Sequence, residues 1–299
     1  MEDREIIESV GKISGDALKY AKTVVKEGAS LKEIADSIER YIRSKGFDIA
    51  FPVNISINEQ AAHYTPRYDL DYEIKASDVI KIDLGAAKES YFGDCALTIN
   101  LDSSNSKLIE ATEEALSNAI AIIKDNVAVK DIGKEIERTI KSKGFIPIYN
   151  LGGHSVERSA LHGDIFIPNY DNGETYKLKE GDVIAIEPFA TDHRGAGYVN
   201  EDSYTEIYSL YDLKPVRDSY ARALLKDIAD SYPDHPFAVR WLYDKHNDIS
   251  RLYLAIRSLV INGNLEPHPG LIERKRGLVA QSEATVIVEK DSCKVITER

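Results

Sequence analysis

The sequence predicts a soluble α+β protein built from two similar halves that are related by a pseudo-twofold axis. One helical pattern, LKEIADSIERYIRSKGF at residues 31–47, returns as VKDIGKEIERTIKSKGF at residues 129–145. A turn and a short apolar strand ending in an acid, SDVIKID at residues 77–83, return as GDVIAIE at residues 181–187. A two-copy repeat is typical of a pseudo-twofold domain, whereas a solenoid needs more copies.

Both copies of the first pattern are expected to be amphipathic helices. Their apolar residues recur three and four positions apart, and Lys-Gly follows the last apolar residue, as at a glycine C-cap. The strands beyond them also follow from composition, because residues 79–84 and 91–99 are rich in β-branched and apolar side chains. We expect these two strands to form a hairpin with its turn near Lys88-Glu89.

The register of this hairpin raises the question of function. Pairing Ile82 with Cys95 gives one apolar face and sets Asp83 opposite Asp94. Like charges directly opposite each other destabilise a sheet. The sequence therefore predicts a positive group between these two carboxylates.

Further candidate ligands follow the second repeat helix. LGGHSVERSALHG at residues 151–163 carries His154 and His162 beside paired glycines, and His63 occupies nearly the same place in the first half as His162 does in the second. A single histidine is more often a surface or core residue than a ligand. Two in one glycine-containing stretch, with a counterpart in the other half, favour a site.

Two glutamates complete the set. Glu187 ends an apolar strand and precedes Pro188; Glu283 lies between Val279 and Val286 in an expected core strand. The alternatives are a solvated turn residue for Glu187 and an edge strand that exposes Glu283 to water. A buried isolated glutamate is rare unless it is paired, protonated or metal-bound.

The segment between these glutamates is expected to be a helical insertion. Its apolar residues recur at helical spacing over two stretches, which are Ala221, Leu224, Leu225 and Ile228, then Leu252, Ala255, Ile256 and Leu259. Basic and acidic residues are nearly balanced at 216–261, so no DNA-binding face is predicted.

Composition excludes other classes of function. The net charge of −12 argues against nucleic-acid binding, and clustered acids suit a cation instead. The apolar runs are strand-sized and no secretory signal is evident, so we expect a cytoplasmic protein without membrane contact. Cys95 and Cys293 are expected to be buried thiols in a reducing compartment.

The chain resembles the pita-bread metallopeptidases, and among them the archaeal form of type 2 methionine aminopeptidases. The resemblance extends from FPVNISINEQAAHYTP through IDLG, GDCALTI, GGHS, IEPFA and PFAVRWL to GLVAQSE. It implies a pita-bread catalytic domain over residues 1–299, interrupted by the type 2 helical insertion at about 205–265. It also implies five metal ligands, which are Asp83, Asp94, His154, Glu187 and Glu283.

The resemblance implies the chemistry as well. Two divalent ions, Co, Mn, Fe or Zn, would activate a water for attack on the first peptide bond of a nascent chain with a small second residue. His63, His162 and Glu187 would be catalytic. The substrate would contact Phe51, His63, Leu161, His162, Phe189 and His268, although ordinary core packing remains an alternative for the pocket residues. Nascent-chain N-termini and the ribosome are the expected partners, and the protein is expected to be a monomer.

Three positions depart from the family pattern. Ser282 and Ala284 flank Glu283 where Phe and His are common, and His268 stands where Tyr is often found. Two other functions were weighed. Xaa-Pro peptidases share the ligand pattern but carry a preceding domain, for which Asp83 leaves no room. A catalytically inactive peptide-binding or ribosome-binding relative would have lost ligands.

Overall fold

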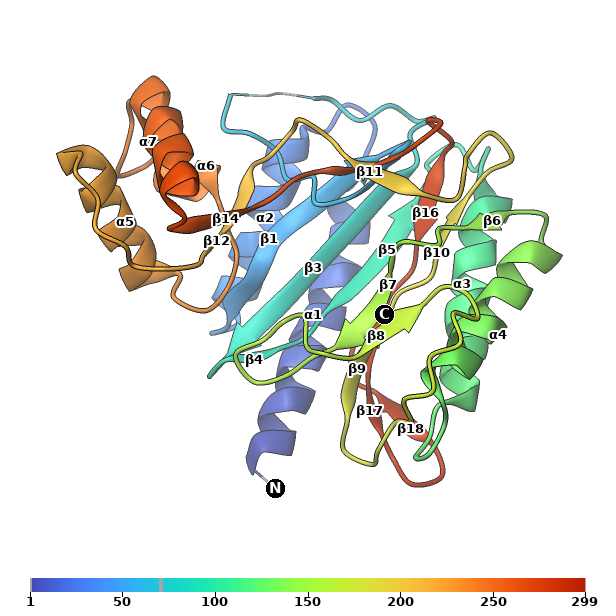
Figure 1. The fold of residues 1–299 in the computed structure, drawn as a ribbon. Helices are drawn as coiled ribbons and strands as arrows, with labels where there is room; N and C mark the ends of the chain where they lie inside the picture. Colours follow the sequence, from blue (N-terminus) through green and yellow to red (C-terminus); the bar gives the residue numbers. More distant parts are fainter. Residues whose placement is uncertain (1, 70–71, 299) are drawn as a thin grey trace.

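The computed structural model describes residues 2–69 and 72–298. In the first half, α1 and α2 pack against one face of a sheet formed by β1, β3, β4 and β5 (Figure 1). The bounds of these elements are α1 Glu2–Val24, α2 Leu31–Ser44, β1 Asp48–Ile57, β3 Ile80–Lys88, β4 Tyr91–Phe92 and β5 Cys95–Ile99. Buried Ile, Leu, Val and Ala side chains from both layers form the core of this half.

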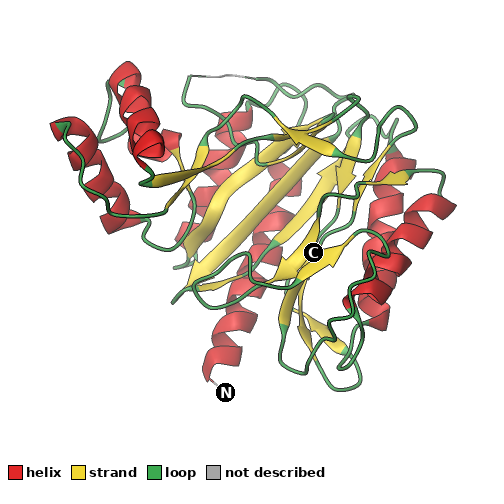
Figure 2. Ribbon diagram, in the orientation of Figure 1, coloured by secondary structure: helices red, strands yellow, loops and turns green. Residues whose placement is uncertain are grey.

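The second half repeats this plan. Helices α3 and α4 cover a five-stranded sheet whose strand order is β18-β17-β9-β7-β8 (Figures 1 and 2). The bounds are α3 Ser106–Ile122, α4 Val129–Ser142, β7 Gly152–Ser155, β8 Phe166–Pro168, β9 Val183–Ile186, β17 Ala284–Val288 and β18 Cys293–Val295. Mixed helices and sheets in two repeated halves confirm the predicted fold class.

The repeated sequence forms repeated structure. Helix α2 forms from the segment that begins LKEI, and α4 from the segment that begins VKDI. Each helix is followed by a glycine with positive φ, Gly46 at 81° and Gly144 at 84°. Strands β3 and β9 arise from the two DVI segments. The repeated segments therefore form the same kind of element in both halves, and α2 packs on β1 while α4 packs on β8.

The hairpin prediction was correct for both strands but wrong in register and turn. Asp83 pairs with Ala96 and Ile82 with Leu97, a shift of two residues from the predicted pairs. The turn is at Glu89-Ser90, where φ is 53° and 62°. Two successive residues with positive φ are typical of the type I′ turn that matches strand twist, and this turn sets the register. A two-residue shift keeps each side chain on its predicted face.

Residues 207–268 form a separate layer at one edge of the molecule. Helices α5, α6 and α7 pack on a small sheet with the order β13-β12-β14, and they have a core of their own (Figure 1). The bounds are β12 Ile207–Leu210, α5 Ser219–Ser231, β13 Phe237–Ala238, α6 Val239–Leu242, α7 Ile249–Asn262 and β14 Leu265–His268. Both stretches with predicted helical spacing lie in helices, α5 and α7.

Short strands join these layers, and no described helix is long and apolar enough to cross a membrane. The remaining bounds are β2 Gln60–Ala62, β6 Ile146–Pro147, β10 Phe189–Thr191, β11 Val199–Glu201, β15 Leu271–Glu273 and β16 Val279–Gln281. The expected continuous strand around Glu283 is interrupted, because β16 ends at Gln281 and β17 begins at Ala284. Glu283 sits in the break with 1% of its surface exposed, which excludes the edge-strand alternative.

Candidate metal centre

The five predicted ligands lie together where the two halves meet. Asp94, His154 and Glu283 each offer a ligand atom, and these atoms lie within 4.8 Å of one another. Asp83, Glu187 and Glu283 form a second group by the same measure. Because Glu283 belongs to both groups, the two sets are adjacent.

The elements that hold these side chains come from both halves. Asp83 lies in β3, Asp94 directly precedes β5, His154 lies in β7, and Glu187 directly follows β9. The backbone of Glu283 connects the halves, since its N–H donates to the Ala96 carbonyl over 3.0 Å, and its own carbonyl accepts from the Ala96 N–H over 3.4 Å. The strand ends of the two halves therefore deliver the acids to one place.

The buried acids lack enough hydrogen-bond donors. One oxygen each of Asp83, Asp94 and Glu283 has no hydrogen-bond partner among the described residues. Lys81, on the same strand as Asp83, donates instead to the carbonyls of Asn58 and Val79, at 2.8 and 3.2 Å. Burial also lowers the pKa of Lys81 well below its usual range, so this amine does not neutralise the acids, and another group must do so.

The electrostatics of the site point the same way. Burial raises the pKa of the Asp83 carboxyl to about 7. Burial, reinforced by the neighbouring carboxylates, raises the pKa values of Asp94, Glu187 and Glu283 well above their usual range. Four carboxylates and an imidazole form an oxygen-rich donor set of the kind that binds Mn²⁺, Fe²⁺, Co²⁺ or Zn²⁺. The residues present fit divalent cations.

His154 is oriented as a ligand by its second ring nitrogen. Its Nδ1 lies 3.1 Å from the carbonyl oxygen of Ser155, which can only accept, so Nδ1 carries the proton. The lone pair is then on Nε2, which lies 3.5 Å from Asp94 Oδ2. Burial lowers the pKa of His154 to about 3, so the ring is neutral at pH 7. A neutral imidazole with an oriented lone pair is the form that binds metals.

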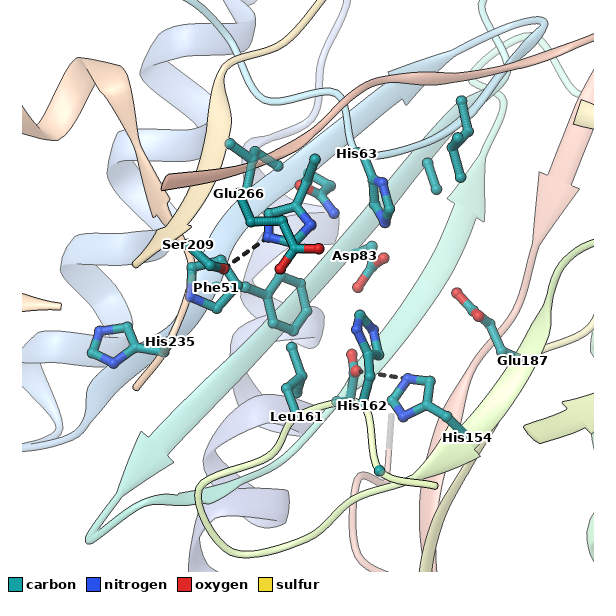
Figure 3. Close-up of a pocket in the computed structure, with 18 of the residues that line it drawn as sticks. Phe51, His63, Asp83, His154, Leu161, His162, Glu187, Ser209, His235 and Glu266 are labelled. Atoms are coloured by element: carbon teal, nitrogen blue, oxygen red, sulfur yellow. Dashed lines mark hydrogen bonds and ion pairs between the residues drawn. The ribbon is translucent and has the colours of Figure 1, made fainter. Parts of the chain in front are cut away.

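A cavity of about 700 Å³ opens onto the acid cluster. Asp83, Asp94, His154 and Glu187 line it. Figure 3 shows Phe51 and Leu161 on one side of Asp83 and Glu187 on the other, with His63 and His162 beside Asp83. Every predicted substrate residue lies on the cavity wall, namely Phe51, His63, Leu161, His162, Phe189 and His268. The structure thus brings the predicted ligands and the predicted pocket into one site.

Two of the pocket histidines are uncharged at neutral pH. Burial, with smaller contributions from His268 and His162, lowers the pKa of His63 to about 4. Its Nδ1 lies 3.2 Å from the Pro269 carbonyl and must carry the proton, so Nε2 has a free lone pair. Burial also lowers the pKa of His162. His63 can accept a hydrogen bond, and His162 can donate one without bringing a charge.

Sequence reasoning missed several residues of the site. Gln281 donates to Glu187 Oε1 over 2.6 Å and to Asp83 Oδ2 over 3.3 Å. Its position two residues before Glu283 was a usable signal, because side chains two apart in a strand share a face. Asn54, Ser209 and Glu266 also line the cavity. Asn54 lies within the quoted stretch FPVNISINEQAAHYTP but was given no role, and Ser209 and Glu266 lie outside the quoted motifs.

Comparison with known proteins shows the family to which the chain belongs. The model of metallopeptidase family M24 matches residues 5–211. The methionine aminopeptidase of Pyrococcus abyssi is 45% identical over 100% of both chains. That of Thermococcus kodakarensis is 43% identical over 99% of this chain and 100% of the relative.

Solved structures share the fold at lower identity. A thermophilic Arx1 has a TM-score of 0.82 with 16% identity, covering 98% of this chain and 90% of that one. The methionine aminopeptidase of Rickettsia prowazekii has a TM-score of 0.69 with 19% identity, covering 99% and 97%. The prolidase of Pyrococcus furiosus has a TM-score of 0.65 with 20% identity, covering 100% of this chain but 64% of the prolidase.

The family match covers more than half of the chain, and relatives above 40% identity extend over its whole length. The chain belongs to metallopeptidase family M24, and its full-length relatives there are methionine aminopeptidases.

Proposed function

We propose that this protein removes the N-terminal methionine from nascent polypeptides whose second residue is small. The observation that carries the proposal is the pair of adjacent ligand groups that share Glu283, four of whose members line one cavity with apolar side chains. The full-length identity to methionine aminopeptidases supports the same substrate. Xaa-Pro cleavage is not favoured, since the relatives that are 43–45% identical over nearly the whole of both chains are methionine aminopeptidases.

We propose that the site holds two divalent ions. Asp94, His154 and Glu283 would hold one, and Asp83, Glu187 and Glu283 the other, with Co, Mn, Fe or Zn as candidates. Such ions lower the pKa of water toward neutrality and polarise the carbonyl of a peptide. The shared carboxylate of Glu283 explains why the chain buries this glutamate in a break between two strands.

The remaining chemistry belongs to the side chains. His162 would donate its N–H to the oxygen of the attacked carbonyl, where negative charge develops. The Nε2 lone pair of His63 would accept a hydrogen bond from the peptide N–H. Glu187, whose carboxyl lines the cavity beside the other acids, would move a proton to the leaving amine.

We propose that the apolar part of the cavity receives the methionine side chain. Phe51, Leu161 and Phe189 are all at least nine-tenths buried and line the cavity near the acids. Buried aromatic and aliphatic surface stabilises a thioether side chain, and sulfur contacts with aromatic rings are favourable. His268 adds a polar edge, since its Nε2 lies 2.7 Å from Ser209 Oγ.

We assign the chain to the type 2 subgroup, with a catalytic domain over residues 1–299 and an insertion at about 205–265. The assignment is supported by the separate helical layer of residues 207–268, which contributes Ser209, Glu266 and His268 to the cavity. The insertion would therefore form one wall of the substrate cleft. Nascent-chain N-termini are the proposed substrate.

The test is methionine release from Met-Ala-Ser by metal-stripped protein titrated with Mn²⁺ or Co²⁺. An Ala-Pro peptide reports Xaa-Pro activity, and Glu283→Gln removes one charge from the shared ligand. Glu289→Gln is a matched control, because Glu289 pairs with Arg4 at the surface. We expect metal-dependent release that is abolished only in Glu283→Gln. Cleavage of Ala-Pro, or no release with any metal, would refute the proposal.

A further inference from the structure

A bulge in β1 shapes one wall of the cavity. Phe51 pairs with Gly85 and Asn54 with Asp83, so β1 has an additional residue between these pairs. Pro52 has no N–H and suits the bulge. Both Phe51 and Asn54 line the cavity. The position of the bulge therefore sets how two pocket residues face the substrate.

The bulged residue Val53 has its backbone groups satisfied by side chains. Its N–H donates to Glu39 Oε1 over 3.2 Å, and its carbonyl accepts from Thr65 Oγ1 over 2.9 Å. Glu39 and Thr65 have exposed fractions of 4% and 1%. A buried backbone group left without a partner is costly, so these two side chains hold the bulge in place.

An arginine from the layer of residues 207–268 donates hydrogen bonds to the same two side chains. Arg240 donates through Nη2 to Glu39 Oε1 and through Nη1 to Thr65 Oγ1, the latter over 2.7 Å. Its side chain is 2% exposed. Trp241 Nε1 adds a bond of 2.8 Å to Glu39 Oε2. The four hydrogen bonds among Val53, Glu39, Arg240 and Thr65 form a closed ring, which we call the Val53 ring.

Arg240 is connected to the opposite wall by neighbouring strands. It follows β13, which pairs with β12, and β12 pairs in turn with β14. These strands carry Ser209 and His268 into the cavity. The tryptophan beside the ring packs against the cores of both the first half and the inserted layer.

We infer that Glu39 and Arg240 are positioning residues that hold the two walls of the methionine pocket at a fixed separation. The inference rests on the proposed function for its substrate, but the ring itself does not involve the metal ligands. One buried guanidinium fixes both the β1 bulge and the β13-β12-β14 sheet. Arginine suits this role because its planar fork bonds two acceptors in defined directions.

The repeat provides a matched control. Glu137 in α4 is the sequence equivalent of Glu39 in α2, yet it pairs with Lys141, whose side chain is 53% exposed. Glu39 contacts the inserted layer through Arg240 and Trp241, whereas Glu137 contacts Lys141 and the N–H of Asp171. Glu39→Gln and Glu137→Gln therefore make the same chemical change at the two equivalent positions.

The experiment measures kcat and KM for Met-Ala-Ser and Leu-Ala-Ser in the metal-loaded full chain. We expect Glu39→Gln and Arg240→Lys to raise KM for Met-Ala-Ser about tenfold, with kcat changed less than about threefold, because the Val53 ring contains pocket-wall contacts and no metal ligand. Discrimination against Leu-Ala-Ser should fall. Trp241→Phe, which removes one bond and keeps the packing, should have a smaller effect, and Glu137→Gln none.

Hydrogen exchange gives a second result that does not depend on activity. The amides of Phe51, Val53 and Asn54 and those of residues 207–210 should exchange faster together in Glu39→Gln and stay protected in Glu137→Gln. Failure of the wild type to release methionine would refute the proposed function. The hydrogen-exchange measurement would still test the role of the Val53 ring. Unchanged exchange in both segments, or a loss of kcat at constant KM, would overturn the inference.

Discussion

In the candidate metal centre, one neutral side chain donates hydrogen bonds to two of the acids. Gln281 donates its amide to Asp83 and Glu187, one acid from each half. Its exposed fraction is 1%. A side-chain amide that donates to two candidate ligands fixes their orientation. Groups that hydrogen-bond metal ligands in this way commonly affect metal affinity. We therefore expect this residue to be part of the metal-binding apparatus.

Gln281→Ala should weaken metal binding without unfolding the protein. Loss of both amide bonds frees Asp83 and Glu187 to rotate, and we expect the affinity for Mn²⁺ to fall about 10- to 100-fold. Isothermal titration of metal-stripped protein measures this. Gln60→Ala is the control, since the Gln60 amide bonds the Ile57 N–H in a turn away from the acids. Equal affinities in the two variants would contradict the prediction.

At the scale of elements, the two halves use the same helix ending for the same purpose. Gly46 and Gly144 have nearly equal positive φ, and a Cβ added at either one would meet no atom within 4 Å. The backbone conformation is therefore the only constraint on these two positions. This conformation directs the backbone after α2 and after α4 toward the strands that lead to the site.

Gly46→Ala and Gly144→Ala should each lower the free energy of unfolding by about 1 kcal/mol, the cost of a Cβ in the left-handed region. The two effects should be similar, because neither methyl group gains or loses a contact. Urea denaturation of each variant measures them. Methionine release should be unchanged, and a difference between the variants of more than about 1 kcal/mol would show that packing contributes at one of them.

At the scale of the whole molecule, the acid cluster lies on the boundary between the two halves. Asp83 and Asp94 come from the first half, His154 and Glu187 from the second, and Glu283 bonds through its backbone to Ala96. Bound cations would therefore connect elements of both halves. Metal binding and folding are expected to be coupled.

Adding Mn²⁺ to metal-stripped protein should raise the free energy of unfolding. At a free concentration 100 times Kd, the gain should be about 2.7 kcal/mol for one site, since the ion binds the folded chain. Differential scanning calorimetry with and without metal measures the rise in Tm. Glu283→Gln should lose most of it, because this carboxylate belongs to both groups. An equal rise in that variant would show that the ions stabilise the chain elsewhere.

Much of the fold could be predicted because it depends on local pattern. The repeated helices, the hairpin strands and the helical stretches of the insertion follow from apolar spacing and glycine signals, which are local. The register of the hairpin was missed by two residues, because the Glu89-Ser90 turn requires positive φ at residues that seldom adopt it. Alternation still placed Asp83 on the correct face.

The sequence by itself determined the two-half plan, the acids at the strand ends and the pocket residues named by motif. Only the tertiary structure decided that Glu283 lies in a break between strands, that Gln281 orients two acids, and that Arg240 closes the Val53 ring. The reason is physical. Periodicity records which face of an element is buried, whereas a hydrogen bond between residues 201 positions apart depends on how separate layers pack.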